Sequence, residues 1–295
     1  MEKTMKLQTV HPRSLTLGEG PIWDERIQTL YFVDILKKTL YRWNYATRQT
    51  HSVVFNDYIS CVALTEDTAQ ILIALESGIH TYIVETGQIY FVCQPESQAN
   101  FRFNDGRVDW NGNWLLGSMN NLNNGPDAPL LPDATLYKID GVKVSPLLKG
   151  VTISNGIVFR KPYIYFIDSK INSIRKFVYE QDQFTMIEEI FKLTDGTTLD
   201  GMCISTNDKL YIANWAGAKI IVFDLIKAKV IDEIPLPCLN PTSCTFGGPE
   251  MNELFITTSS IDDSNVTIAG VYVIPLSEKG MPENKVSLNS FYNEP

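Results

Sequence analysis

Short runs in which apolar and polar residues alternate, separated by tight polar turns, extend along most of this chain of 295 residues. The first full example spans residues 17–34, with a Gly-Glu-Gly-Pro corner, the apolar pair Ile22 and Trp23, a polar turn and the segment Leu-Tyr-Phe-Val. Alternation with a period of two, in segments rich in aromatic and β-branched side chains, predicts β-strands. A stripe with the 3.6-residue helical period is not found over a helical length, so we expect almost no helix.

The order of polar corner, short strand, turn and longer strand recurs six times, in repeats that begin near residues 18, 60, 103, 154, 199 and 241. A repeat of about 40–50 residues with about four short strands is typical of one propeller blade. The pattern predicts an all-β fold, a six-bladed β-propeller with four-stranded antiparallel blades around a central channel. Residues 1–295 should form it as a single domain. Residues 6–10 should pair with the last blade, because an open edge strand invites aggregation.

The third repeat is lengthened by residues 119–134, which are rich in Asn, Gly and Pro. This composition predicts a loop. Long loops inside compact folds are often functional. We interpret the segment as a lid over the mouth of the channel, with a plain insertion as the alternative.

Polar residues stand at the corners that open the repeats. The first strands of propeller blades meet at the axis, so these side chains should gather at one mouth of the channel. Burying an unpaired carboxylate there would cost several kcal/mol, and a divalent cation would remove that cost. Oxygen donors suit Ca²⁺, Mg²⁺ or Mn²⁺, with Zn²⁺ as a further possibility. The residues are Glu19, Asn104, Asp105, Asn155 and Asp200.

Each of these residues, taken alone, has a simpler explanation. Asn and Asp are common turn formers because they tolerate left-handed backbone conformations. That explanation does not cover Glu19, since Glu is a poor turn residue. It also does not explain why all of them fall at the same position of the repeat. Taken together, the set therefore favours a metal site.

Charge and cysteine content narrow the class of protein. The formal net charge of −9 leaves no basic surplus to neutralise phosphates, which argues against a nucleic-acid or anionic-membrane partner. The N-terminus lacks the apolar stretch of a signal peptide, and no apolar run approaches membrane-spanning length. The five cysteines have no C-x-x-C spacing, which is typical of free thiols in a reducing compartment. We therefore expect a cytoplasmic protein.

Histidine is scarce, with only His11, His51 and His80, and none of them lies at a corner. A Ser-His-Asp device or a His-rich zinc site is therefore not expected. Arg102 precedes Asn104 by two residues and would share a face of the strand with it. Its guanidinium could hold an oxygen-rich substrate beside the metal. An ordinary surface arginine is the alternative on spacing alone.

Four motifs in this order and spacing resemble the SMP-30/gluconolactonase/luciferin-regenerating-enzyme family, which includes regucalcin. They are Leu-Gly-Glu-Gly-Pro at residues 17–21, Arg-Phe-Asn-Asp-Gly-Arg at 102–107, Ser-Asn-Gly-Ile at 154–157 and Leu-Asp-Gly-Met-Cys-Ile at 199–204. The resemblance extends from about residue 18 to residue 273. It implies a six-bladed propeller that hydrolyses sugar lactones with a divalent metal.

The resemblance also implies roles for individual residues. The metal ligands would be Glu19, Asn155 and Asp200, with Asp200 as the general base. Substrate contacts would come from Arg102 and Asn104, and we add Asp105 and Asn120 as candidates. Asn120 and Asn121 stand where acidic residues are frequent in the family, which leaves the identity of the substrate open.

The expected function is therefore hydrolysis of an aldonolactone of the gluconolactone type to the sugar acid by a carboxylic ester hydrolase. The cofactor would be one divalent metal ion, Ca²⁺ being expected in a crystal, with Zn²⁺, Mg²⁺, Mn²⁺ or Fe²⁺ as alternatives. The metal would polarise the carbonyl or activate water. Alternatives are hydrolysis of another ester or a phosphotriester, a non-catalytic calcium-binding regulator, and an interaction scaffold. We expect a monomer or a weak homodimer with a small-molecule partner.

Overall fold

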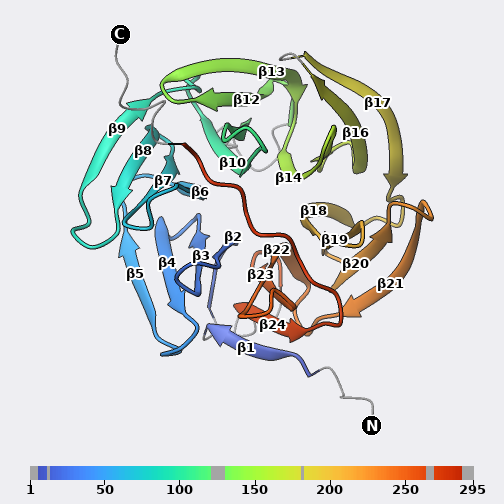
Figure 1. Cartoon of the computed structure of the whole chain (residues 1–295). Helices are drawn as coiled ribbons and strands as arrows, with labels where there is room; N and C mark the ends of the chain where they lie inside the picture. The colour runs from blue at the N-terminus through green and yellow to red at the C-terminus, as the bar shows by residue number, and fades with distance from the viewer. Residues whose placement is uncertain (1–5, 12–13, 121–129, 181–182, 264–268, 288–295) are drawn as a thin grey trace. The chain divides into compact units, whose positions relative to one another are not determined.

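The computed structural model describes residues 6–11, 14–120, 130–180, 183–263 and 269–287. Every regular element in these residues is a β-strand, which confirms, for this part of the chain, the expectation of almost no helix (Figure 1). The chain divides into two compact units, residues 1–55 with 193–282 and residues 56–192 with 283–295. No helix in the described residues is long and apolar enough to cross a membrane.

The first unit contains three four-stranded antiparallel sheets. One sheet consists of β2 (Gly18–Asp24), β3 (Thr29–Asp34), β4 (Thr39–Asn44) and β5 (Thr50–Val54). A second consists of β18 (Thr198–Ile204), β19 (Lys209–Trp215), β20 (Lys219–Asp224) and β21 (Lys229–Pro235). The third consists of β22 (Asn240–Gly247), β23 (Glu253–Ser259), β24 (Val271–Pro275) and β1 (Gln8–His11).

The N-terminal strand β1 is the outermost strand of the sheet that contains β22 (Figure 1). It pairs antiparallel with β24, with Gln8 opposite Val273 and His11 opposite Val271. An N-terminal segment therefore pairs with the last sheet, although the strand covers residues 8–11 and not the expected residues 6–10. The pairing supplies the fourth strand of a sheet whose other three strands lie at the far end of the chain.

The second unit also contains three four-stranded antiparallel sheets. One consists of β6 (Ile59–Leu64), β7 (Gln70–Leu75), β8 (Gly78–Ile83) and β9 (Ile89–Cys93). The next consists of β10 (Phe101–Val108), β11 (Trp114–Asn120), β12 (Ala134–Asp140) and β13 (Lys143–Val151). The last consists of β14 (Ser154–Arg160), β15 (Tyr163–Asp168), β16 (Ser173–Glu180) and β17 (Gln183–Lys192).

These six sheets are the blades of the predicted six-bladed β-propeller, so the fold class is confirmed. Their first strands begin at residues 18, 59, 101, 154, 198 and 240, each at or up to two residues before the expected start. Whether the whole chain behaves as a single domain stays a prediction.

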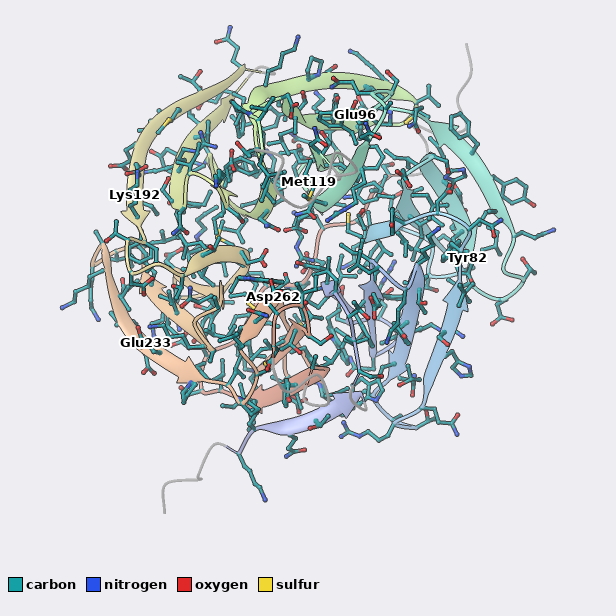
Figure 2. All side chains as sticks on the ribbon, turned by 180° about the vertical axis from the view of Figure 1, so that it is seen from behind. Tyr82, Glu96, Met119, Lys192, Glu233 and Asp262 are labelled. Carbon is teal, nitrogen blue, oxygen red and sulfur yellow. The ribbon has the colours of Figure 1, made fainter. Side chains whose placement is uncertain are left out.

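Within each sheet, the fourth strand is more exposed to solvent than the first. The first strand of a blade, here called its inner strand, is almost completely buried, and β10 is buried at every position. The fourth strands β5, β9, β17 and β21 are mostly exposed. Figure 2 shows Glu233 on β21, where it pairs with Lys219 at 2.8 Å. A strand buried on both faces reads as a continuous apolar run, which makes its few polar residues notable.

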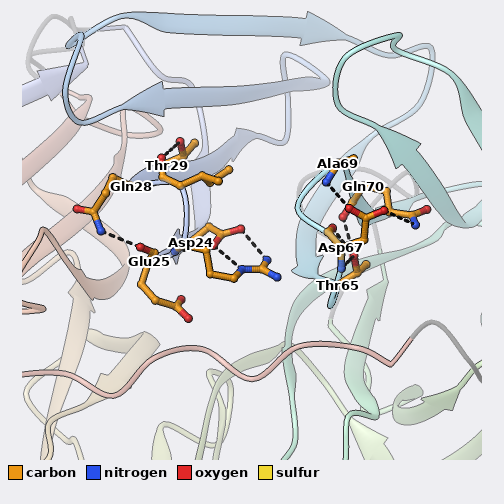
Figure 3. Close-up of polar contacts among 10 residues, drawn as sticks. Asp24, Glu25, Gln28, Thr29, Thr65, Asp67, Ala69 and Gln70 are labelled. Atoms are coloured by element: carbon orange, nitrogen blue, oxygen red, sulfur yellow. Dashed lines mark hydrogen bonds and ion pairs between the residues drawn. The ribbon is translucent and has the colours of Figure 1, made fainter.

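Polar turns join the inner strand of a blade to its second strand. In the first blade, Arg26 donates to both carboxylate oxygens of Asp24, and Gln28 Nε2 donates to the Glu25 carbonyl oxygen at 2.8 Å (Figure 3). In the second blade, Thr65 Oγ1 donates to the Gln70 carbonyl oxygen, and Asp67 accepts from the backbone N–H of Ala69 (Figure 3). Side chains that bond the backbone nearby favour turns over continued strand, as the sequence pattern predicted.

Two further expectations concern the cysteines and the long loop. All five cysteines are free thiols, and four of them are buried. The predicted lid, residues 119–134, falls mainly on residues 121–129, which lie outside the described residues, as does Asn121. Only its two ends are described, residues 119–120 at the end of β11 and residues 130–134, the last of which begins β12.

Candidate active site

Every inner strand contains a β-bulge, and each bulge lies at the same place in its blade. The pairing register with the second strand shifts between residues 19 and 22, 59 and 61, 103 and 106, 154 and 157, 199 and 202, and 241 and 243. A bulge adds an unpaired residue and redirects its side chain, and bulges are common beside active sites. All five corner residues predicted from the sequence lie at these bulges: Glu19, Asn104, Asp105, Asn155 and Asp200.

Glycine follows the candidate ligands for two different local reasons. Gly20 has a φ of 53°, in the left-handed region that glycine tolerates best. A Cβ at Gly201 would lie 2.8 Å from the Cα of Ser243, so β18 and β22 approach too closely there for a side chain. Glycine is therefore needed for the backbone conformation after Glu19 and for the close approach of two strands after Asp200.

In the first unit, two acidic side chains lie at bulges of different blades. Glu19 is 5% exposed, and its Oε2 accepts a hydrogen bond from the backbone N–H of Gly20 at 3.0 Å. Asp200 is 6% exposed at the bulge of β18. Carboxylates that are nine-tenths buried require compensation by hydrogen bonds or by a cation.

In the second unit, a continuous chain of hydrogen bonds joins four buried side chains. Arg102 Nη1 donates to Asn104 Oδ1 at 2.6 Å, and Asn104 Nδ2 donates to Asn155 Oδ1 at 3.0 Å. Asn155 Nδ2 then donates to Ser169 Oγ at 2.8 Å. The structure therefore brings together the two predicted substrate-binding residues and one predicted metal ligand. The amide of Asn155 is held by hydrogen bonds at both its oxygen and its nitrogen.

Asp105 makes different contacts from its neighbour Asn104. Its Oδ1 accepts from the backbone N–H of Gly106 at 2.8 Å, and the charged groups near it are Arg107 and Glu283, themselves paired at 3.5 Å. Burial raises the pKa of Asp105 above its usual value, and Arg107 offsets part of that rise. Adjacent bulge residues thus have separate partners, and Asp105 is not part of the Arg102–Asn104–Asn155 chain of hydrogen bonds.

Asn120 is the last residue of β11 and pairs with Phe101 at the start of β10, next to the pair of Arg102 with Met119. Its Oδ1 is buried and accepts no hydrogen bond from the described residues. Asn120 therefore presents a buried polar oxygen one ladder position from Arg102, at the edge of the described part of the predicted loop.

The remaining three bulges share a different feature, although the third blade also carries Asp105 there. In the second blade, Ser60 Oγ donates to the carbonyl oxygen of Phe103, the residue before the next bulge. In the third blade, Asn104 Nδ2 donates to the carbonyl oxygen of Ser154 at 2.7 Å. In the sixth blade, Thr242 Oγ1 donates to the carbonyl oxygen of Gly18. At these bulges a side-chain donor bonds one blade to the next. Carboxylates cannot donate in this way, so Glu19 and Asp200 are not needed for that structural purpose.

The bulges of β2, β14 and β18 carry oxygen donors of the kind that cations bind. Glu19 and Asp200 of the first unit are buried carboxylates, Asn155 of the second unit is a buried amide, and such hard oxygens are the ligands that Ca²⁺, Mg²⁺ and Mn²⁺ prefer. Within the described residues, no group of three or more His, Cys, Asp or Glu side chains could hold a metal ion. A histidine or thiolate centre is therefore absent from that part of the chain.

Sequence reasoning missed the residues that support this set. Ser169, which fixes Asn155, follows the segment Tyr-Phe-Ile-Asp that ends β15. Asp34 and Asp168 are the last residues of β3 and β15, and Asn214 is the next-to-last residue of β19. That recurrence was a visible signal, but a polar residue at a strand end is equally well explained as the start of a turn.

Comparison with known proteins shows similarity over most of the chain. A sequence model of the SMP-30/gluconolactonase/LRE-like region matches residues 17–260. Regucalcin of Macaca fascicularis is 30% identical over 260 residues, which are 86% of this chain and 87% of regucalcin. Luciferin-regenerating enzyme superposes with a TM-score of 0.88 at 25% identity, covering 96% of this chain and 100% of that one. A regucalcin from Agrobacterium tumefaciens strain C58, described as a calcium-binding protein, superposes with a TM-score of 0.86 at 23% identity, covering 95% and 97%.

Proposed function

Because this chain belongs to the SMP-30/gluconolactonase/LRE-like family, as its motifs predicted, we propose that it is a divalent-metal-dependent lactonase. It would hydrolyse a sugar lactone of the aldonolactone type to the corresponding sugar acid. The observation that carries the proposal is the position of Glu19, Asn155 and Asp200, each buried at the bulge of an inner strand. These are the residues that the family motifs assign to the metal.

The metal, when bound, would supply a Lewis acid for the carbonyl and lower the pKa of water in the site. Asp200 would take a proton from the attacking water, whose oxygen adds to the lactone carbonyl carbon. The ring C–O bond then breaks, and the departing alkoxide oxygen takes up a proton. The product is an open-chain sugar acid, so water is the only co-reactant.

Arg102 and Asn104 would orient the substrate. Arg102 is 6% exposed and already bonds Asn104, so its planar guanidinium is held in one position before a ligand arrives. Pre-positioned donors reduce the entropy lost when a flexible polyol binds. Asp105 and Asn120 remain proposed as substrate contacts, with Asn120 supported by its buried Oδ1, which accepts no hydrogen bond from the residues that the structure describes.

A non-catalytic calcium-binding protein is the second candidate. It is favoured by the names of the similar proteins, regucalcin among them, one of which is described as calcium-binding. The same oxygen donors would hold Ca²⁺ in this case, without turnover. Hydrolysis of another ester or of a phosphotriester would use the same residues and differ only in the substrate.

We further propose that the protein acts in the cytoplasm, as a monomer or weak homodimer. The support for a reducing compartment is that all five cysteines are free, including the pair Cys203 and Cys244, whose Sγ atoms are 3.5 Å apart. Thiols this close would be prone to oxidation in an oxidising compartment. Size-exclusion chromatography with light scattering would test the oligomeric state.

The experiment that tests the function is acid release from a panel of aldonolactones by metal-stripped protein. Ca²⁺, Mg²⁺, Mn²⁺, Zn²⁺ or Fe²⁺ is added back separately, with a simple aryl ester and a phosphotriester as comparison substrates. Metal-dependent hydrolysis of a lactone would support the proposal and identify both the ion and the preferred sugar. Metal binding with no turnover of any lactone would favour the calcium-binding alternative, and turnover only of the other esters would change the substrate class.

A further inference from the structure

In each blade, one residue of the inner strand lies just before the bulge. The residue of the second strand that pairs with it occupies the same position in all six blades. In the three blades that carry a proposed metal ligand, this residue is Asp34, Asp168 or Asn214, opposite Gly18, Ser154 and Leu199. Each is completely buried, with 0% exposure. We name these three residues the corner clamps.

The clamp of the first blade bonds the segment that leads into Glu19. Asp34 Oδ2 accepts from the backbone N–H of Thr16 at 2.8 Å, and Oδ1 accepts from that of Leu17 at 3.1 Å. Oδ1 also accepts from the N–H of Lys37 at 3.2 Å, in the turn after β3. One carboxylate therefore ties together the start of the inner strand and the end of the second strand, only two residues before Glu19.

The clamp of the fourth blade repeats this arrangement in the other unit. Asp168 accepts from the backbone N–H groups of Thr152 at 2.9 Å and Ile153 at 3.2 Å, and from that of Lys170 at 3.1 Å. Ile153 lies two residues before Asn155. The two bonds to the segment before the proposed ligand therefore match those of Asp34 position for position, and the third again reaches the turn after the second strand.

The clamp of the fifth blade has the opposite polarity. Asn214 Nδ2 donates to Thr197 Oγ1 at 2.8 Å and to the carbonyl oxygen of Thr198 at 3.2 Å. Thr198 lies two residues before Asp200. Asn214 therefore bonds the segment just before a proposed ligand, as Asp34 and Asp168 do. It does so as a donor, whereas the two carboxylates are acceptors.

The three blades without a proposed ligand lack this clamp. Their corresponding residues are Leu75, Ser118 and Thr258. Ser118 Oγ bonds Glu96 and the backbone of Thr135, and Thr258 Oγ1 bonds the backbone of Gly270, so both hydroxyls contact the outer side of their blades. Nevertheless the second blade keeps a backbone bond from Glu76 N to Tyr58 O, the equivalent of Ile35 N to Leu17 O in the first blade. Closing the sheet therefore does not require the clamp.

We propose that the corner clamps are positioning residues for the metal site, an inference that rests on the proposed function. They touch neither substrate nor metal; they fix the backbone two residues ahead of Glu19, Asn155 and Asp200. A buried carboxylate that accepts several backbone N–H bonds allows little movement of that backbone, because each lost bond leaves a buried polar group without a partner. Each ligand oxygen would then be held in one position on its own strand before the cation binds.

The test compares Asp168→Asn with the matched control Asp109→Asn in the same unit. Asp109 is also completely buried and also bonds two backbone N–H groups, those of Asn111 at 2.8 Å and Asn113 at 2.9 Å. It follows the last residue of β10, at the opposite end of the strand from Asn104. Both variants should lower the unfolding midpoint, so stability alone does not distinguish a clamp from any other buried turn aspartate.

The measured quantity is the Mn²⁺ dissociation constant of the full chain, from the electron paramagnetic resonance signal of free Mn²⁺. We expect Asp168→Asn and Asp34→Asn to weaken binding about 10–100-fold, and Asp109→Asn to leave it within about twofold of the wild type. If Asp168→Asn does not fold, Asp168→Ser introduces the residue type that the third blade has at this position, and the same loss is expected.

Two results would overturn the inference, and they are distinct. If the wild type binds Mn²⁺, Glu19→Gln weakens it, and the clamp variants bind as tightly as the wild type, the clamps are structural only. If the clamp variants and Asp109→Asn lose affinity equally, the loss follows stability and the positioning role is wrong. A wild type that binds neither Mn²⁺ nor any ion of the add-back panel would instead contradict the proposed function itself, together with what rests on it.

Discussion

The second and fourth blades, β6–β9 and β14–β17, lie in the same unit and differ in what their inner strands carry. Both are four-stranded antiparallel sheets with a buried inner strand and a bulge after its first residue. At that bulge the second blade has Ser60, which donates to the carbonyl oxygen of Phe103 on the neighbouring inner strand. The fourth blade has Asn155, which is bonded to Asn104 and Ser169 instead.

The comparison separates what the fold requires from what the chemistry requires. In the second blade, the single hydroxyl of Ser60 occupies the bulge and bonds the neighbouring blade, so the fold requires no more than a hydroxyl there. The Asn155 side chain is bonded at both ends of its amide, and Asp168 bonds the backbone just before it. These bonds are more than the bulge of the second blade needs. Features beyond the needs of folding are expected where a site is built. The blades that carry the proposed ligands therefore differ from the second blade in these supporting bonds as well.

The largest effect is expected from removing the proposed metal ligands. Asp200→Ala and Glu19→Ala should each lower kcat/KM for the best lactone about 10³-fold or more, because the site loses a charged ligand and, at Asp200, the general base. Metal content, measured by elemental analysis, should fall with activity. If either variant keeps wild-type turnover and metal content, the assignment of that residue is wrong.

Metal removal should lower stability in the wild type but not in a ligand variant. A ligand that binds only the folded state at about 100 times its dissociation constant contributes about 2.7 kcal/mol. We therefore expect a chelator to lower the unfolding midpoint of the wild type clearly and that of Asp200→Ala hardly at all. Thermal unfolding followed by circular dichroism measures both. Equal shifts in the two proteins would place the metal elsewhere.

Ser60→Ala should lower the free energy of unfolding and leave metal affinity unchanged. The buried carbonyl oxygen of Phe103 loses this donor but still accepts from Arg102 Nη1 at 2.8 Å, so the expected cost is that of one hydrogen bond, about 0.5–1.5 kcal/mol. Urea unfolding should detect this loss, whereas metal affinity and kcat/KM should stay within about twofold of the wild type. A large loss of metal affinity in Ser60→Ala would show that the second blade also takes part in the site.

The smallest expected effect is a pH dependence at Asp105. Its pKa is raised in the folded state by burial, so the ionised form is disfavoured there. The stability associated with this group is present below its unfolded-state pKa and is lost as the pH rises through the folded-state pKa. Asp105→Asn removes that loss, so the variant should gain stability relative to the wild type at about pH 7 compared with about pH 4. Urea unfolding at both pH values checks this, and an identical difference at the two would contradict it.

The sequence predicted the strands and the six repeats because both are local patterns. Alternation in segments such as Tyr-Ile-Tyr-Phe-Ile before Asp168 identifies a strand without knowledge of its neighbours. The recurring corner residues also identified the positions that the structure shows as bulges. The family motifs then gave these residues their proposed roles.

The sequence could not predict which side chains contact each other across blades. Asn104 and Asn155 are 51 residues apart, and their hydrogen bond depends on the packing of two separate inner strands. Asp34 and Asp168 looked like ordinary strand ends, because an acidic residue there fits a turn equally well. Asp105 followed Asn104 in the motif, yet its separate partners, Arg107 and Glu283, become visible only when residues far apart in the chain are placed together.

The central claim, that one divalent ion held by Glu19, Asn155 and Asp200 supports lactone hydrolysis, is tested most directly by an add-back titration. Metal-stripped protein at known concentration receives increasing amounts of the best ion, and the initial rate of acid release is recorded against ion added per chain. We predict negligible activity at the start, a rise to a plateau at one ion per chain, and no rise for Asp200→Ala. Full activity in protein shown by elemental analysis to be free of metal would contradict the claim.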